Sequence, residues 1–90
     1  STAGTVLITG ANRGIGLEFV RRYAERGWMV IATVRKPAEA TELAALAQQH
    51  KGVRIETLDV ARVESIAALG KRLAGQPIDV LVNNAGVLGD

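Results

Sequence analysis

The chain has 90 residues, of which 48% are hydrophobic and 22% are charged, and it contains no cysteine. Its net charge is +2 and its basic residues are scattered, which argues against a nucleic-acid surface, and the lack of cysteine excludes disulfides and thiolate metal sites. No apolar run reaches the roughly 18 residues of a membrane span, and no signal peptide precedes the first apolar run. We therefore expect one soluble, cytoplasmic domain with no membrane partner.

The first half of the chain predicts two strands and two helices. Residues 6–8 are apolar on both faces and predict a buried strand. Residues 15–26 carry apolar side chains at helical spacing, and Gly27 follows in the position where helices often end. Residues 28–34 predict a second buried strand. Pro37 then suits the first turn of a second helix, which Lys51-Gly52 closes.

The second half continues the alternation. Residues 53–58 alternate between apolar and polar side chains, which predicts a strand with one wetter face at the edge of a sheet. Residues 63–74 return to helical spacing and end at Gly75, and residues 78–82 predict a fourth strand that is apolar on both faces. The order β-α-β-α-β-α-β predicts an α/β fold with a partial, Rossmann-type doubly wound parallel sheet in the strand order 3-2-1-4.

A glycine-rich loop, Thr9-Gly10-Ala11-Asn12-Arg13-Gly14-Ile15-Gly16, lies directly between the first strand and the first helix. Glycines in such a loop allow a tight turn, the approach of backbone to a pyrophosphate, and close packing of helix against strand. The helix N-terminus offers free N–H groups to the phosphates. Three glycines also fit an ordinary strand–helix connection, but the buried strand before them and the amphipathic helix after them favour dinucleotide binding.

Two further motifs follow the third and fourth strands. Together with the glycine spacing, Leu58-Asp59-Val60 and Asn83-Asn84-Ala85-Gly86 resemble the short-chain dehydrogenase/reductase family over essentially all 90 residues. The resemblance implies that Asp59 receives the adenine ring, and that the asparagine motif steadies the sheet and lines the cofactor cleft. Asp59 could instead cap the following helix, and the asparagines could be turn formers.

The end of the second predicted strand indicates which nicotinamide cofactor binds. An acidic residue there would bind the ribose hydroxyls of NAD(H), but Val34 holds that place and Arg35 and Lys36 follow it. Arg13 adds a basic group within the glycine loop, as in NADP-preferring members of the family. A guanidinium can hold a phosphate through two parallel hydrogen bonds, so our hypothesis is NADP(H) rather than NAD(H). The alternative is that both arginines are solvated surface charges.

The candidate cofactor-binding residues are Gly10, Asn12, Arg13, Gly14, Ile15, Gly16, Arg35, Asp59, Val60, Asn83, Asn84, Ala85 and Gly86.

The resemblance implies an oxidoreductase that transfers hydride between the nicotinamide and a carbonyl or alcohol. The family's catalytic Ser and Tyr-x-x-x-Lys lie after the asparagine motif. Tyr23 has Gly27 rather than Lys four residues later, and Ser1 and Ser65 have no base at a usable spacing. His50 is a solvated residue rather than a metal ligand. We therefore assign no catalytic residue and no metal site.

Residues 1–90 are expected to be the NAD(P)-binding, N-terminal half of a longer parent domain, inactive alone. The fourth strand would be an open edge, apolar on both faces, which favours a homo-oligomer or pairing with another chain through that edge. Two alternatives to the enzyme remain at this stage. The chain could be a non-catalytic dinucleotide-binding or regulatory module, or a self-associating fragment.

Overall fold

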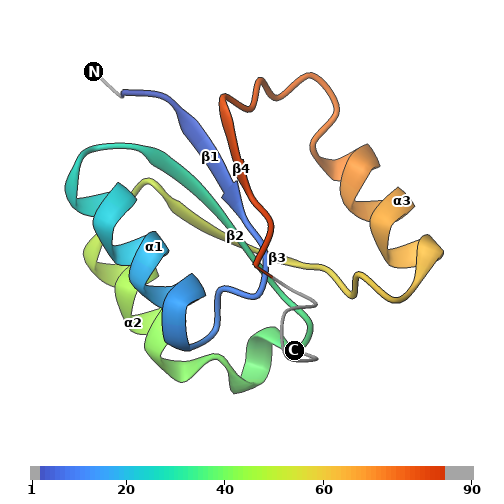
Figure 1. Cartoon of the computed structure of the whole chain (residues 1–90), viewed down its shortest axis with the longest axis horizontal. Helices are drawn as coiled ribbons and strands as arrows, with labels where there is room; N and C mark the ends of the chain where they lie inside the picture. Colours follow the sequence, from blue (N-terminus) through green and yellow to red (C-terminus); the bar gives the residue numbers. More distant parts are fainter. Residues whose placement is uncertain (1–2, 85–90) are drawn as a thin grey trace.

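The computed structural model describes residues 3–84 and has the predicted α/β architecture, with helices on both faces of a parallel sheet (Figure 1). In chain order, the elements are β1 (Thr5–Ile8), α1 (Gly14–Glu25), β2 (Met29–Val34), the short 3-10 helix η1 (Pro37–Glu39), α2 (Thr41–Gln49), β3 (Val53–Thr57), α3 (Val63–Arg72) and β4 (Val80–Val82).

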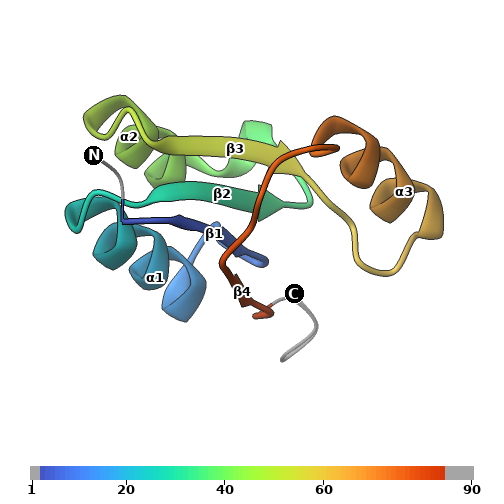
Figure 2. The same cartoon turned by 90° about the horizontal axis from the view of Figure 1, so that it is seen from above.

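The sheet has the strand order β3-β2-β1-β4, which confirms the predicted topology. All three neighbouring pairs are parallel, and Figure 2 shows β3, β2 and β1 side by side with their arrowheads pointing the same way. In the register, Val6 of β1 pairs with both Val30 of β2 and Val80 of β4. β1 is buried along its whole length, as the apolar residues 6–8 predict, and Thr5 at its start is buried with them.

Each face of the sheet has its own hydrophobic core. α1 and α2 cover one face, where Val20 and Leu43 pack with Ile8 of β1. α3 covers the opposite face, where Leu69 packs with Leu7 and Ile31. Because successive residues of a strand point to opposite faces, the apolar runs of β1 and β2 supply both cores at once.

The segment after β2 differs from the single helix that was predicted from Pro37 onward. The structure has η1, then a break at Ala40, then α2. Ala40 has φ −91° and ψ 67°, which is not helical, and its methyl group is buried in the core of α1 and α2. The non-helical backbone of Ala40 therefore separates the two helical segments, while its side chain belongs to the core.

The fourth strand, Val80–Val82, is shorter than the predicted residues 78–82, because the Asp79 side chain takes the place of a backbone acceptor at its start. The Asp79 carboxylate accepts a hydrogen bond from the Thr5 N–H at 2.8 Å, and the Asp79 N–H donates to the Thr5 carbonyl at 2.8 Å. Regular pairing with β1 therefore starts at Val80. The third helix is likewise shorter than predicted, ending at Arg72.

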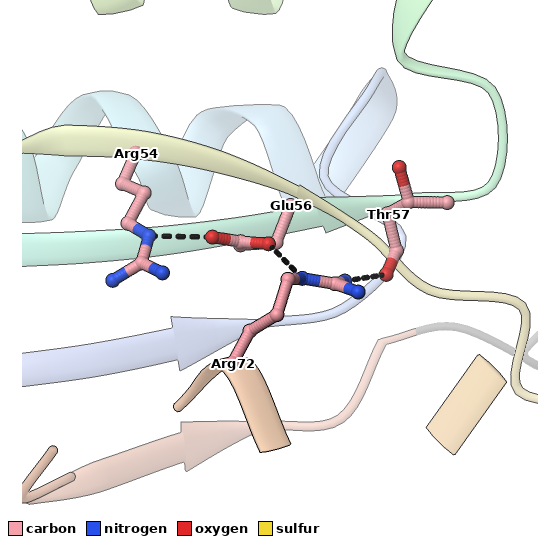
Figure 3. Close-up of polar contacts among 4 residues, drawn as sticks. All are labelled: Arg54, Glu56, Thr57 and Arg72. Atoms are coloured by element: carbon pink, nitrogen blue, oxygen red, sulfur yellow. Dashed lines mark hydrogen bonds and ion pairs between the residues drawn. The ribbon is translucent and has the colours of Figure 1, made fainter. Parts of the chain in front are cut away.

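A cluster of charged side chains ties α3 to the edge strand β3 (Figure 3). Glu56 accepts hydrogen bonds from the Nε atoms of Arg54 at 2.5 Å and of Arg72 at 2.7 Å. Arg72 also donates from Nη2 to the backbone carbonyl of Thr57 at 2.9 Å. Burial raises the pKa of Glu56, but the hydrogen bonds and charges of Arg72 and Arg54 outweigh it and leave that pKa below its ordinary 4.5.

We expect Glu56→Gln to lower the free energy of unfolding by about 1 kcal/mol at neutral pH, because the amide lacks the charge that both guanidiniums bind. A carboxyl group whose pKa is lowered by folding stabilises the folded protein at pH values above the pKa that the group has in the unfolded chain. The difference from wild type should therefore shrink as the pH falls below about 4.5, since Glu56 itself then takes up a proton. Urea unfolding at a series of pH values measures this.

Glu64→Gln is the matched control, on the helix α3 that also carries Arg72. The Glu64 side chain is 81% exposed and lies 3.8 Å from Arg62. Its substitution should change stability by a few tenths of a kcal/mol. An equal loss from both substitutions would contradict a special role for Glu56.

Candidate functional site

The candidate residues gather where the four parallel strands end. Thr9 follows β1, Arg35 follows β2, Asp59 lies two residues beyond β3, and Asn83 follows β4. From this edge, α1 lies over one face of the sheet and α3 over the other (Figure 1). The strand order therefore reverses between β1 and β4, the place where open α/β sheets bind ligands.

The glycine loop packs tightly on one side and is open on the other. Gly10 and Gly14 have positive φ angles of 61° and 59°, which glycine adopts without strain. A Cβ at Gly14 would meet no atom within 4 Å. A Cβ at Gly16, by contrast, would overlap the Gly10 carbonyl oxygen and approach Asn84 Nδ2 to 2.8 Å. Only glycine at position 16 lets α1 begin this close to β1 and β4.

Four hydrogen bonds join the end of β4 to the end of β1. The Thr9 N–H donates to the Val82 carbonyl at 3.0 Å, and the Thr9 hydroxyl donates to Asn83 Oδ1 at 3.1 Å. The Asn84 N–H donates to Thr9 Oγ1 at 2.9 Å, and Asn84 Nδ2 donates to the Gly10 carbonyl at 3.1 Å. The two asparagines thus hold the glycine loop against the sheet, which is more than a turn-forming role.

Two buried threonines in this network had no role in the sequence analysis. Thr9 is described above, and Thr33 of β2 donates from its hydroxyl to the Ile8 carbonyl at 3.2 Å. The Thr33 carbonyl in turn accepts the Ala11 N–H at 3.1 Å. The sequence does contain a signal for such residues, namely a threonine inside or at the end of an apolar run. A hydroxyl that is buried there needs a hydrogen-bond partner.

The N-terminus of α1 carries no side-chain cap. Arg13 holds the N-cap position and its side chain has no acceptor atom, and the first turn contains no acidic residue. The first turns of α2 and α3 contain Glu42 and Glu64. The positive end of the α1 dipole is therefore not offset by an acidic residue of its own first turn.

The end of β2 separates a core residue from a charged one. Val34 is buried against α1 and α2, while Arg35 and Lys36 are exposed at the carboxyl end of the strand. Asn12 and Arg13 of the glycine loop are half-buried and exposed, respectively. This edge of the sheet therefore presents basic side chains on both the loop and the end of β2.

Asp59 organises the turn between β3 and α3. Its Oδ1 accepts the Ala61 N–H at 3.0 Å, and its own N–H donates to Ser65 Oγ at 2.7 Å. α3 begins at Val63 with Arg62 as its N-cap, so Asp59 caps the turn that precedes the helix rather than the helix itself. Val60 is exposed beside it.

The other residues considered in the sequence analysis fall outside the described residues or are engaged in other contacts. Ala85 and Gly86, the last two candidate cofactor residues, fall outside residues 3–84. Tyr23 packs edge-on against Trp28, with ring centroids 4.9 Å apart. Ser65 is engaged with Asp59, as described above.

Two further observations concern the described residues only. Among residues 3–84, no three His, Asp or Glu side chains come together as metal ligands do. None of the helices in this range combines the length and the apolar composition that crossing a bilayer requires.

A hollow of about 550 Å³ lies along the outer side of α1. Its lining consists of Ile15, Glu18, Phe19, Arg22, Tyr23, Arg26 and Trp28.

Comparison with known proteins agrees with this geometry. The family model described as short chain dehydrogenase matches residues 4–90. The oxidoreductase YusZ of Bacillus subtilis, itself described as uncharacterized, is 43% identical over 89% of this chain and 30% of its own length. The chain spans about a third of the length of the curated relatives it matches.

Two solved structures are similar in fold and sequence. One, from Burkholderia multivorans, is described as a short-chain dehydrogenase/reductase with bound NADP. It is 44% identical with a TM-score of 0.86, over 92% of this chain and 36% of that one. The other is a carbonyl reductase from Pseudomonas aeruginosa PAO1 in complex with NADP. It is 36% identical with a TM-score of 0.86, over 92% of this chain and 38% of that one.

We expect Gly16→Ala to lower the free energy of unfolding by about 2 kcal/mol or more, because the new methyl group would overlap backbone that cannot move away. Gly70→Ala is the matched control, since a Cβ there meets no atom within 4 Å and alanine favours a helix interior. It should raise stability by up to about 1 kcal/mol. Thermal unfolding of both variants measures the difference, and equal effects would contradict the close packing at Gly16.

Proposed function

The chain belongs to the short-chain dehydrogenase/reductase family, and from that premise we propose that it binds NADP(H) at its glycine loop as the cofactor-binding part of an oxidoreductase. One observation carries the proposal. The Gly16 backbone packs against the Gly10 carbonyl and the Asn84 amide, which brings the start of α1 to the point where the strand order reverses. A pyrophosphate at this point would lie against backbone N–H groups rather than side chains.

The loop fits a pyrophosphate in both space and charge. The position of a Cβ at Gly14 is open, so a phosphate can approach the backbone there without meeting a side chain. No acidic residue of the first turn of α1 competes with an anion for its N–H groups. Gly10, Asn12, Ile15 and Gly16 complete the proposed loop contacts.

The basic groups at this edge support NADP(H) over NAD(H). Arg35 is exposed at the end of β2, where no acidic residue follows the buried Val34. We propose that Arg35 and Arg13 flank the 2′-phosphate, which guanidinium groups bind well. The similar proteins from Burkholderia multivorans and Pseudomonas aeruginosa were both solved with NADP.

The remaining contacts follow the strand ends. Asp59 and Val60 would face the adenine ring, and the Asp59 side chain would do so while keeping its bond to Ala61. Asn83 and Asn84 would line the path toward the nicotinamide, together with Ala85 and Gly86. Asn84 would keep its bond to the Gly10 carbonyl, so cofactor and sheet would share one anchor.

The proposed reaction is hydride transfer between the nicotinamide and a carbonyl or alcohol. When bound, the nicotinamide would supply or accept the hydride, while this chain's residues would hold the cofactor and its phosphates. We assign no catalytic residue to the described residues, because Tyr23 packs on Trp28 and Ser65 binds Asp59. We propose that the whole protein acts on a carbonyl or alcohol and that the 90-residue chain alone is inactive.

We expect NADPH to bind more tightly than NADH, because only NADPH carries the 2′-phosphate that Arg35 would hold. Arg35→Ala should weaken NADPH binding by about tenfold or more and leave NADH binding nearly unchanged, since a hydrogen bond to a charged group contributes about 1.5–3 kcal/mol. Isothermal titration of the purified chain with each nucleotide measures both dissociation constants.

Arg21→Ala is the control, because this exposed arginine lies on α1 and pairs with Glu18 at 3.4 Å. It removes the same charge away from the strand ends and should leave both affinities unchanged. Equal or tighter binding of NADH would contradict the NADP(H) assignment. If Arg21→Ala and Arg35→Ala weakened NADPH binding equally, the effect would come from the net charge of the protein and not from a contact of Arg35.

A separate measurement tests whether the 90-residue chain catalyses hydride transfer or only binds the cofactor. The 90-residue chain with saturating NADPH and a simple aldehyde should show no oxidation of NADPH above the rate without protein, because it lacks a Tyr-x-x-x-Lys pair. Absorbance at the NADPH band follows the reaction. Turnover would show that a residue of this chain does the proton transfer that we leave unassigned.

A further inference from the structure

The chain leaves the sheet at Asp59, two residues beyond the end of β3. The Leu58 N–H still donates to the Val34 carbonyl of β2 at 2.9 Å. The Asp59 carbonyl then accepts the Arg62 N–H at 3.0 Å, and Oδ1 of Asp59 accepts the Ala61 N–H at 3.0 Å. Both of these last bonds lie within the turn between β3 and α3, so they shape the turn without attaching it to the rest of the fold.

One face of α3 holds the end of β3 through three residues at helical spacing, namely Ser65, Leu69 and Arg72. The Ser65 hydroxyl oxygen accepts the Asp59 N–H at 2.7 Å. Leu69 belongs to the core against which the leucine before Asp59 packs. Arg72 donates to the Thr57 carbonyl at 2.9 Å, as Figure 3 shows. Successive residues at the end of β3 are therefore attached to successive turns of α3, and Asp59 is attached to the first of them.

The Asp59 carboxylate has one oxygen engaged and one available. Oδ1 accepts the Ala61 N–H, whereas no donor in residues 3–84 binds Oδ2. An ionised carboxylate only accepts hydrogen bonds, and the exocyclic amino group of adenine donates them. In the proposed complex, Oδ2 can therefore bind that amino group, and a base with an oxygen in the same place would lose the bond.

We propose that Ser65 is a positioning residue for adenine recognition, because its bond to the Asp59 N–H holds the Asp59 carboxylate where Oδ2 meets the amino group of the base. This role rests on the proposed NADP(H) site. Ser65 does not contact the cofactor and acts only through the Asp59 backbone. Among the contacts of residues 3–84, the Ser65 hydroxyl makes the one hydrogen bond from within α3 to Asp59, so its loss would free the turn that carries the carboxylate.

Discrimination between two bases tests the proposal. The probes are NADPH and its analogue in which hypoxanthine replaces adenine, and isothermal titration of the 90-residue chain gives both dissociation constants. We expect wild type to bind NADPH about tenfold more tightly than the analogue, because the analogue loses a hydrogen bond to a charged group. Ser65→Ala should lower this preference to about threefold or less, and Ser65→Thr should restore it because threonine keeps the hydroxyl. Alanine favours helices, so α3 should stay folded.

Glu64→Ala is the matched control, since Glu64 precedes Ser65 in the same turn of α3. Its side chain is 81% exposed and pairs with Arg62 at 3.8 Å rather than with Asp59. This substitution should leave the preference for adenine unchanged. Hydrogen exchange of the nucleotide-free chain adds a measurement that needs no ligand. The Asp59 amide should exchange about tenfold or more faster in Ser65→Ala than in wild type or Ser65→Thr.

The possible outcomes separate this proposal from the proposed function. If Ser65→Ala weakened the binding of both nucleotides equally, its role would be structural and the proposal would be wrong. Equal binding of the two nucleotides by wild type, or an unchanged exchange rate of the Asp59 amide in Ser65→Ala, would also overturn it. In each of these cases, tighter binding of NADPH than of NADH would leave the NADP(H) site standing. A chain that binds neither NADPH nor the analogue would overturn both.

Discussion

The close approach of α1 to the ends of β1 and β4 is the constraint on which the rest of the candidate site depends. Gly16 permits it because no side chain separates the helix from the Gly10 carbonyl. Asn84 holds the same carbonyl from the β4 side, so one backbone oxygen joins a helix, a loop and an edge strand. This contact fixes where α1 begins and in which direction its N-terminus points. It thereby also fixes the position of Gly14, the open side of the loop.

The central position of β1 supports this contact from several sides. β1 is buried along its length, with β2 and β4 on either side, and the Thr33 hydroxyl and carbonyl hold the Ile8 carbonyl and the Ala11 N–H. The loop therefore leaves a strand that is fixed from both edges and both faces. A ligand that binds at the loop would contact backbone that is already ordered in the folded protein, so binding would require little further loss of conformational entropy.

The sequence predicted the fold well where patterns are local. Alternating apolar runs and amphipathic helices were sufficient for the element order and for β3 at an edge, and the handedness rule supplied the strand order. Element ends were less predictable, because Ala40 and Asp79 act through contacts with distant segments. The candidate site was located through its glycines and asparagines, but the bonds of Thr9 depend on strand pairing that no local pattern encodes.

At the end of β2, a buried residue and an exposed residue follow each other directly in the chain. Val34 contributes to the core and Arg35 to the charge at the rim, although they are adjacent in the chain. A substitution at the exposed position alters the electrostatic preference of the rim while the buried one keeps the packing of the sheet. In the proposed site, a single substitution at position 35 would therefore change the preference for NADP(H) or NAD(H) without disturbing the packing of the sheet.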